Sequence, residues 1–279
     1  MTYKTILVHA DGTPQAEQRI RLAALVALAH DAHLVGAAMT GLSRHALPDG
    51  SIAAVGTPFP FDLRLLHDRA DAALSQFTEC ASRLGVPSIE ARRVDDAADD
   101  GLILQSPYAD LLVLSQADPH DHSNSLPARL PQTVMFHSAR PVLLVPHAGR
   151  FEQTGKHVLV GWNGSASAAR AVTAALPLLK RAAAVTVAAS PQTGGHGRQT
   201  DVPGAELARF LFRHGVDVKL LPQEDDRRAG EALLDLASEN GADLLVMGGY
   251  GHQRLQEWLL GGATRTVLRG MTLPVLMAH

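Results

Sequence analysis

Cysteine and aromatic residues are scarce in this sequence. Its one cysteine, Cys80, cannot form an internal disulfide, which is the pattern expected of a protein from the reducing cytoplasm. Phenylalanine, tyrosine and tryptophan together make up 4% of the residues, too few for a platform on which single-stranded nucleic-acid bases stack. We therefore expect a cytoplasmic protein that does not recognise nucleic acid by stacking.

A strong charge excess and long apolar runs are also missing. The formal net charge of −3 gives no electrostatic basis for general nucleic-acid binding. No uninterrupted apolar run approaches the ~20 residues that a membrane helix needs. The first eight residues are typical of a short strand, not of a signal peptide. We therefore expect neither a nucleic acid nor a membrane as a partner.

An internal repeat is the main feature that the sequence does contain. Two separate segments recur after 133 residues, and a third recurs after 152, so the first copy carries extra residues. The extra residues fall in 42–60, where prolines and glycines indicate a loop. The matching segments are Ala109–Leu114 with Ala242–Met247, Arg140–Val145 with Leu273–Ala278, and Ile6–Thr13 with Val158–Ser165. The chain therefore consists of two copies of one module.

Strand and helix patterns alternate within each copy, which is typical of an α/β fold. In the first copy we expect strands at 4–10, 33–40, 88–94, 110–115 and 141–146, and helices at 14–30, 62–84, 98–107 and 126–138. In the second we expect strands at 156–162, 183–189, 216–222, 243–248 and 274–278, and helices at 165–181, 203–214, 228–240 and 262–270. This predicts two tandem Rossmann-like modules, residues 1–147 and 155–279, each with five parallel strands covered by helices on both faces.

Four residues mark helix ends in these patterns. Thr13, followed by a proline, predicts a hydroxyl cap at the start of the first helix, and Ser165 predicts the same in the second copy. Gly85 and Gly215 each follow a helical pattern, as glycines at helix C-termini do.

A glycine-rich segment in the second copy is the candidate for chemistry. The fourth strand runs into Gly248, Gly249 and Gly251, and Gly261 and Gly262 then open a helix nine residues later. Glycines let backbone amides approach an anion, and a helix start presents unpaired N–H groups. The segment therefore suits phosphate groups, although glycines that only make a tight turn and pack a helix closely remain an equal alternative.

With this loop, both halves resemble the universal stress protein family, and the chain resembles a tandem member. ATP-binding members of that family carry G-x-x-G, nine residues, then G followed by Ser or Thr. Here the pattern is Gly248-x-x-Gly251, nine residues, Gly261 and then Gly262, so the hydroxyl is missing. The first strand ends in Asn163 where the family has Asp, and an amide can still form hydrogen bonds.

The resemblance implies an ATP site in the second half, with or without Mg²⁺. It implies an adenosine pocket lined by Gly161, Asn163 and Met247, with a second-strand residue, Val187 or Ala189, against the adenine. His252 beside the loop is a candidate phosphate contact, with a solvated loop face as the alternative. The residues expected to face the phosphates and ribose are Gly248, Gly251, Gly261, Gly262, Ala263 and Thr264.

The first copy lacks this loop. The positions equivalent to Gly248, Gly251, Gly261 and Gly262 are occupied by Ser115, Asp118, Ala128 and Arg129. A carboxylate at a phosphate position repels the ligand. Asp11 alone survives at the end of the first strand. We therefore expect the first half to be a nucleotide-free partner. The resemblance implies that the last strands of the two halves pair within one chain as a pseudo-dimer, and it leaves association of two chains open.

Other chemistry finds little support in the sequence. Asp118, His120 and His122 could share a metal ion, but a polar loop explains them better in a chain with 14 histidines, and we assign no metal site. No pattern indicates an activated nucleophile, and we assign no catalytic residue. The leading hypothesis is a regulatory, ATP-binding stress-response protein. The alternatives are a nucleotide-free interaction module and a slow ATP hydrolase of the same architecture.

Overall fold

The computed structural model describes the backbone in six ranges, residues 2–42, 63–118, 129–190, 202–222, 229–249 and 262–279. The chain divides into two compact units, which are described separately below. One contains Tyr3–Arg140, and the other contains Pro141–His279 together with the first two residues. The ends predicted for the two modules, 147 and 155, are not tested by this division and stay a prediction.

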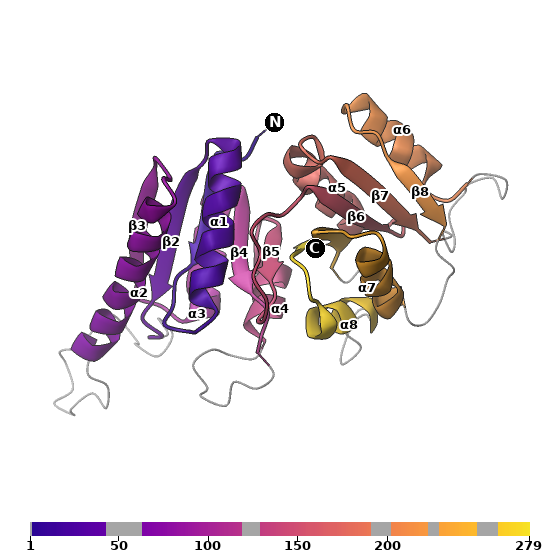
Figure 1. Cartoon of the computed structure of the whole chain (residues 1–279). Coiled ribbons are helices and arrows are strands. Elements are labelled where there is room, and N and C mark those ends of the chain that lie inside the picture. Colours follow the sequence, from indigo (N-terminus) through magenta and orange to yellow (C-terminus); the bar gives the residue numbers. More distant parts are fainter. Residues whose placement is uncertain (1, 43–62, 119–128, 191–201, 223–228, 250–261) are drawn as a thin grey trace. The chain divides into compact units, whose positions relative to one another are not determined.

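The first unit is a four-stranded parallel sheet with helices on both faces (Figure 1). Its strands are β1 (Thr5–His9), β2 (His33–Met39), β3 (Ile89–Val94) and β4 (Leu111–Ser115), in the spatial order β3-β2-β1-β4. The first two α-helices of this unit contact each other, and so do its last two. Right-handed connections, which are the rule between parallel strands, put the two pairs on opposite faces of the sheet. The helices are α1 (Ala16–His30), α2 (Leu63–Arg83), α3 (Ala98–Gln105), the 3₁₀ helix η3 (Ser106–Tyr108) and α4 (Leu130–His137).

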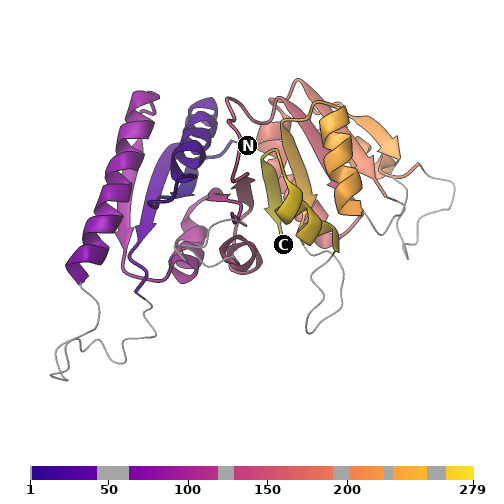
Figure 2. The ribbon, with the colours of Figure 1, turned by 60° about the horizontal axis from the view of Figure 1, so that its bottom comes forward.

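The second unit repeats this four-stranded arrangement and adds two strands beside it. Its strands are β5 (Val142–Val145), β6 (His157–Trp162), β7 (Ala184–Ala189), β8 (Lys219–Pro222), β9 (Leu244–Gly248) and β10 (Val275–Ala278), in the order β5-β10-β9-β6-β7-β8. All neighbours are parallel except β5 and β10. The helices are α5 (Ala166–Leu179), α6 (Ala205–Arg213), α7 (Ala229–Glu239) and α8 (Gly262–Gly270). Helices α7 and α8 lie side by side (Figure 2).

The α/β architecture and the elements predicted from the sequence are confirmed. Each predicted strand and helix is present, and most ends agree within two residues. The largest differences are the strand expected at 216–222, which begins at Lys219, and the helix expected at 126–138, which begins at Leu130. The antiparallel pairing of Val275 with Leu144 joins the last strands of the two copies, as the pseudo-dimer prediction required.

The repeated Ala-Asp pair explains part of the internal symmetry. Asp110 precedes β4, and its Oδ2 accepts the N–H groups of Lys4 and Thr5 at 2.7 and 3.0 Å. Asp243 precedes β9 and accepts three N–H groups at the start of β6 in the same way, at 2.9 to 3.1 Å. A half-buried carboxylate that accepts several backbone N–H groups fixes the start of the neighbouring strand. Both copies therefore align their two central strands with the same residue.

The central strands form the core of each unit. Their aliphatic side chains are almost fully buried, as expected for parallel strands covered on both faces. Cys80 is buried on α2, where burial raises the pKa of its thiol. Within the described residues, no helix has both the length and the apolar character needed to cross a membrane.

Candidate functional site

The carboxyl ends of β6 and β9 are where the second unit should hold a ligand. These neighbouring strands lie at the point where the strand order reverses, and ligands of open parallel sheets bind at such points. Helix α5 follows β6, and α8 runs back towards β10, so the N-termini of both helices lie at this edge of the sheet. The topology therefore brings two helix starts to the predicted loop.

Gly248, the last residue of β9, lies against the first turn of α5. A Cβ atom at this position would be 2.4 Å from the backbone nitrogen of Ala168 and 2.6 Å from Oγ of Ser167. The same turn is capped by Ser165, whose Oγ accepts the Ala168 N–H at 3.2 Å, which confirms the predicted hydroxyl cap. Glycine is required here by close packing, because any side chain would displace the capped turn.

Asn163 follows β6 and is exposed. Its Oδ1 accepts the backbone N–H of Ser165 at 3.1 Å, which fixes the turn that leads into α5. Gly161 and Met247 lie on the adjacent strands at the same end of the sheet, and they pair with each other in register. A Cβ atom at Gly161 would approach Leu233 of α7 to 3.1 Å. Three residues predicted to line the adenosine pocket are thus neighbours in the fold.

Helix α8 begins at Gly262, which is exposed. A Cβ atom at Gly262 would meet no other atom of the described residues within 4 Å, so none of them would be displaced by a side chain there. Ala263 and Thr264 belong to the same first turn, and Thr264 is buried. Packing against the described part of the chain does not explain a glycine at position 262. The predicted residues Gly251, His252 and Gly261 lie outside the described residues.

Val187 and Ala189, the two candidates for the adenine contact, are fully buried in β7. Cγ1 of Val187 lies 3.7 Å from the position of a Cβ atom at Gly204, where α6 begins. Ala189 lies closer to that position, at 2.9 Å. Both residues therefore pack under the start of α6, and their contact with adenine stays a prediction.

The equivalent edge of the first unit is filled by an arginine that the sequence analysis did not single out. Arg19 of α1 is fully buried. Its Nε donates to the carbonyl oxygen of His9 at 2.7 Å, and its Nη1 donates to Oγ of Ser115 at 2.8 Å. Its Nη2 lies 3.0 Å from Oδ1 of Asp11. The guanidinium thus joins the ends of β1 and β4 across the strand-order reversal.

Asp11 also explains why the predicted Thr13 cap is wrong. The backbone N–H and the hydroxyl of Thr13 both donate to Oδ1 of Asp11, so the Thr13 hydroxyl is already used. Helix α1 begins at Ala16, and Gln15 at its N-cap forms no side-chain cap. A carboxylate two residues upstream can accept both groups of a threonine, and this local turn delays the helix start.

The charges of this cluster shift two pKa values. Burial tends to raise the pKa of Asp11, but the Arg19 guanidinium, His9 and the Thr13 hydrogen bonds outweigh it and lower the pKa to about 2. Burial lowers the pKa of His9 to about 4, and nearby Asp11 only partly opposes this effect. At neutral pH the cluster therefore holds an ionised Arg19–Asp11 pair beside a neutral His9, whose Nδ1 lies 3.3 Å from Asp11 Oδ2.

We expect the first unit to lose stability in acid in two steps. Below pH 6.5 the unfolded state takes up a proton on His9 that the folded state refuses down to about pH 4. Below pH 3.8 the unfolded state also protonates Asp11, which stays ionised in the folded state to about pH 2. Both effects favour unfolding as the pH falls, at about 1.4 kcal/mol per unit of pKa shift at most.

The check is chemical denaturation of His9→Gln between pH 7 and 4. This variant should lose less stability than the wild type over that range, because the unfolded chain no longer gains the His9 proton. The matched control is His67→Gln, which removes a partly exposed histidine of α2 in the same unit. Equal acid sensitivity of His9→Gln and the wild type would contradict the assignment.

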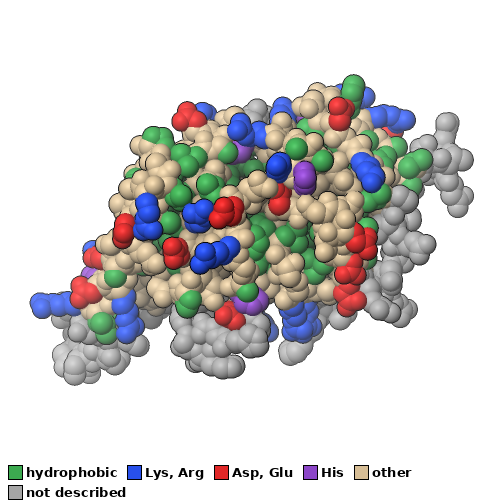
Figure 3. Space-filling model, in the orientation of Figure 1, with side chains coloured by type: hydrophobic (Ala, Val, Ile, Leu, Met, Phe, Trp, Pro, Cys, Tyr) green, Lys and Arg blue, Asp and Glu red, His purple; other side chains and the backbone are tan. Residues whose placement is uncertain are grey.

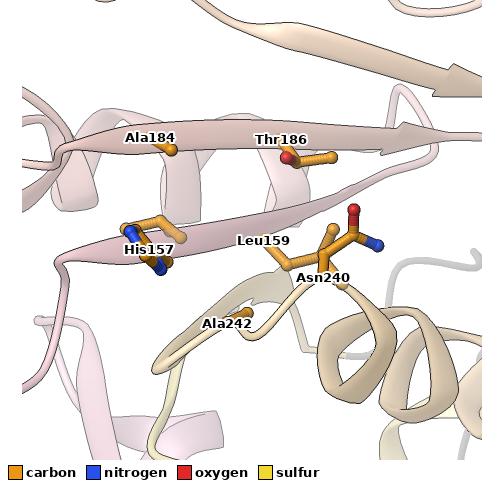
Figure 4. A pocket seen from close by; sticks show the side chains of 7 residues that line it. His157, Leu159, Ala184, Thr186, Asn240 and Ala242 are labelled. Carbon is orange, nitrogen blue, oxygen red and sulfur yellow. The ribbon is translucent and has the colours of Figure 1, made fainter.

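A small pocket of about 130 Å³ lies at the opposite end of the second sheet. Figure 4 shows its lining, in which His157, Leu159, Ala184 and Thr186 come from β6 and β7, while Asn240 and Ala242 follow α7. It lies near the amino ends of the strands, away from the predicted loop. The described residues hold no cluster of three metal-ligating side chains, and His120 and His122 lie outside them.

Surface charge agrees with the composition. On the face shown in Figure 3, Lys and Arg side chains are interspersed with Asp and Glu side chains. Such mixed charge does not form the basic stripe that phosphate backbones favour.

Comparisons with known proteins give a consistent result. Residues 155–279 match the universal stress protein family. The universal stress protein Slr1230 of Synechocystis sp. strain PCC 6803 is 42% identical over 48 residues, which are 17% of this chain and 17% of that protein. A universal stress protein structure from Archaeoglobus fulgidus DSM 4304 has a TM-score of 0.74 at 15% identity, covering 98% of this chain and 95% of that one.

A second solved structure also resembles nearly the whole chain. It is a functionally unknown protein from Pseudomonas aeruginosa PAO1, with a TM-score of 0.59 at 15% identity, and the match covers 98% of this chain and 92% of that one. At these identities the structural similarity concerns the fold. It extends over both copies of the repeat.

Proposed function

We propose that the chain is a universal stress protein that binds ATP or a related adenine nucleotide in its second half, because residues 155–279 match that family. The bound nucleotide would act as a regulatory signal in a stress response. The first half would take part as a nucleotide-free structural partner.

One observation carries the proposal beyond the family match. Gly248 at the end of β9 allows the backbone to approach the first turn of α5, and Gly262 opens α8 at a position where a Cβ atom would meet none of the described residues within 4 Å. A helix N-terminus offers unpaired N–H groups and the positive end of the helix dipole to an anion. Two helix starts and a glycine-bearing strand end at one edge of the sheet suit a chain of phosphates.

The adenosine end of the ligand would lie towards β6. Asn163 keeps its Oδ1 on the Ser165 N–H, so its Nδ2 is the group with which it can donate to a ligand. Gly161 and Met247 are register partners beside it. These residues fit the nucleoside that the family resemblance implies, and no covalent step is required of them.

The nucleotide content of the purified protein tests the proposal. The protein is denatured, the supernatant is resolved by nucleotide chromatography, and the intact protein is titrated with Mg-ATP by calorimetry. We expect about one nucleotide per chain. Two per chain would show that the first half binds as well. A protein that contains no nucleotide and gives no heat on titration with Mg-ATP would favour the nucleotide-free interaction module. Release of ADP and phosphate on incubation with ATP would favour the slow hydrolase.

Gly262→Ser should strengthen ATP binding about 2- to 10-fold, because the new hydroxyl can donate one hydrogen bond to a phosphate at the start of α8. The added side chain displaces none of the described residues, since a Cβ atom there meets none of their atoms within 4 Å. Titration calorimetry measures the change, with Gly262→Ala as the control that adds a methyl group but no donor. If Ser and Ala variants bind equally, the first turn of α8 does not face a phosphate.

A further inference from the structure

The two halves can be compared position by position at the ends of their central strands. Val8 pairs with Val113 in the first unit, and Val160 pairs with Val246 in the second. These pairings give the same displacements, 152 and 133 residues, as the sequence repeat. The registers of the two sheets therefore identify which residues are equivalent.

The same displacement aligns α1 with α5. The buried residues Ala16, Arg19, Ile20, Ala23, Ala24 and Ala27 of α1 correspond to the buried residues Ala168, Ala171, Val172, Ala175, Leu176 and Leu179 of α5. Arg19 is the only charged side chain in either set. Its counterpart Ala171 is likewise fully buried. One position thus holds a methyl group in the second half and a guanidinium in the first.

Two further exchanges accompany this one. His9 stands where the second half has Gly161, and Ser115 stands where it has Gly248. Arg19 links the other two, because it donates to the main-chain carbonyl of His9 and to the Ser115 hydroxyl. In the second half the equivalent residues are two glycines and an alanine. The three exchanges therefore lie together at the strand-order reversal.

We propose that Arg19 is a built-in occupant of the first half. Its guanidinium takes the place of a ligand at the carboxyl ends of β1 and β4 and closes that site. Asp11, Ser115 and the His9 carbonyl are its binding groups. The contact is autoinhibitory with respect to ligands and stabilising with respect to the fold. The inference does not depend on ATP binding by the second half, because every group in it belongs to the first unit.

Removing the Arg19 side chain should lower the melting temperature, and free guanidinium ion should restore part of the loss. In Arg19→Ala, the Asp11 carboxyl group loses its buried cation, and a space of side-chain size opens beside it. Breaking a buried ion pair by removing one partner is strongly destabilising, so the melting temperature of the first unit should fall by about 10 °C or more. A free guanidinium ion has the charge and the donors to enter that space.

The experiment compares melting temperatures with and without guanidinium chloride at about 10 mM, where its denaturing effect is negligible. Sodium chloride at the same concentration controls for ionic strength. Arg19→Ala should regain several degrees with guanidinium and none with sodium, whereas the wild type should not respond. Arg21→Ala, which removes a partly exposed arginine from the same helix, should also not respond.

Two outcomes would overturn the proposal. One is an Arg19→Ala protein as stable as the wild type, and the other is a destabilised protein on which guanidinium and sodium act alike. If Arg19→Ala does not fold, its refolding yield with each salt gives the same comparison. The double variant Asp11→Asn/Arg19→Met, which removes both charges, should fold but show no guanidinium response, because the acceptor carboxylate is gone.

Transfer of the first half's charged pair into the second half provides a second test. Its readout is ATP binding, so it rests on the proposed function. Asn163→Asp/Ala171→Arg places the carboxylate and the guanidinium of the first half into the second. This variant should still fold, but it should no longer show the heat of ATP binding that titration calorimetry measures for the wild type. Retained ATP binding in this variant would contradict the occupant role, whereas absence of ATP binding in the wild type would contradict only the proposed function.

Discussion

Gly251→Asp is expected to abolish nucleotide binding while leaving the fold intact. The substitution copies the first half, where Asp118 stands at the equivalent position and accepts the Gln15 side-chain amide at 2.9 Å. A carboxylate next to phosphate oxygens adds like-charge repulsion, which costs several kcal/mol, and we expect ATP affinity to fall at least about 100-fold. Calorimetric titration measures the loss, and a thermal melt monitors the fold.

Gly251→Ala separates charge from shape in this test. A methyl group can obstruct the approach of the backbone to a phosphate, but it brings no charge, so this variant should bind more tightly than Gly251→Asp. Unchanged affinity in Gly251→Asp would remove the glycine loop from the site. Gly251 itself lies outside the described residues, so this prediction depends on the sequence repeat and on the place of Asp118.

Gly248→Ala is expected to have the largest effect on the stability of the second unit. The added Cβ would lie 2.4 Å from the Ala168 nitrogen, a backbone atom that cannot rotate away, and 2.6 Å from the Ser167 hydroxyl. The methyl group must therefore displace the first turn of α5, whose N–H is held by Ser165. Overpacking typically costs about 1–3 kcal/mol, and a backbone clash belongs at the upper end of that range.

Chemical denaturation measures this change, and Gly262→Ala is its matched control. Both variants add one methyl group to a glycine of the same proposed site, but at Gly262 the methyl group meets no atom within 4 Å in the part of the chain that the structure describes. Gly248→Ala should therefore be destabilised and bind ATP weakly, and Gly262→Ala should retain the stability of the wild type. Similar denaturation midpoints for the two variants would show that α5 does not pack on Gly248.

The local signals of the sequence predicted this fold well where they act over a few residues. Ser165 caps α5 as expected, and Gly85 and Gly215 adopt positive φ after their helices. The prediction failed at Thr13, although its sequence context resembles that of Ser165. The difference is one upstream residue, because the Asp11 carboxylate engages both the N–H and the hydroxyl of Thr13, whereas Asn163 engages only the N–H of Ser165.

The candidate site was predicted in part. The sequence repeat located the glycine positions and the contrast between the halves, and the structure brings Gly161, Met247 and Gly248 to one edge of the sheet. The reason for a glycine at 248 emerged only from its distance to α5. The sequence did not predict that Arg19 occupies the equivalent edge of the first sheet. The signal that could have revealed it is an arginine in the middle of the apolar face of α1, at a position where the second copy has an alanine.

The amino-acid sequence by itself determined the two-copy plan, the order of strands and helices, and the difference between the glycine loops, because these depend on local patterns and on the repeat spacing. Tertiary structure decided the rest. Ser115 and Arg19 are 96 residues apart, and β5 pairs with β10 from the far end of the chain. Such contacts depend on how strands are ordered in a sheet, and a buried guanidinium is tolerated only where that order supplies its carboxylate, hydroxyl and carbonyl partners together.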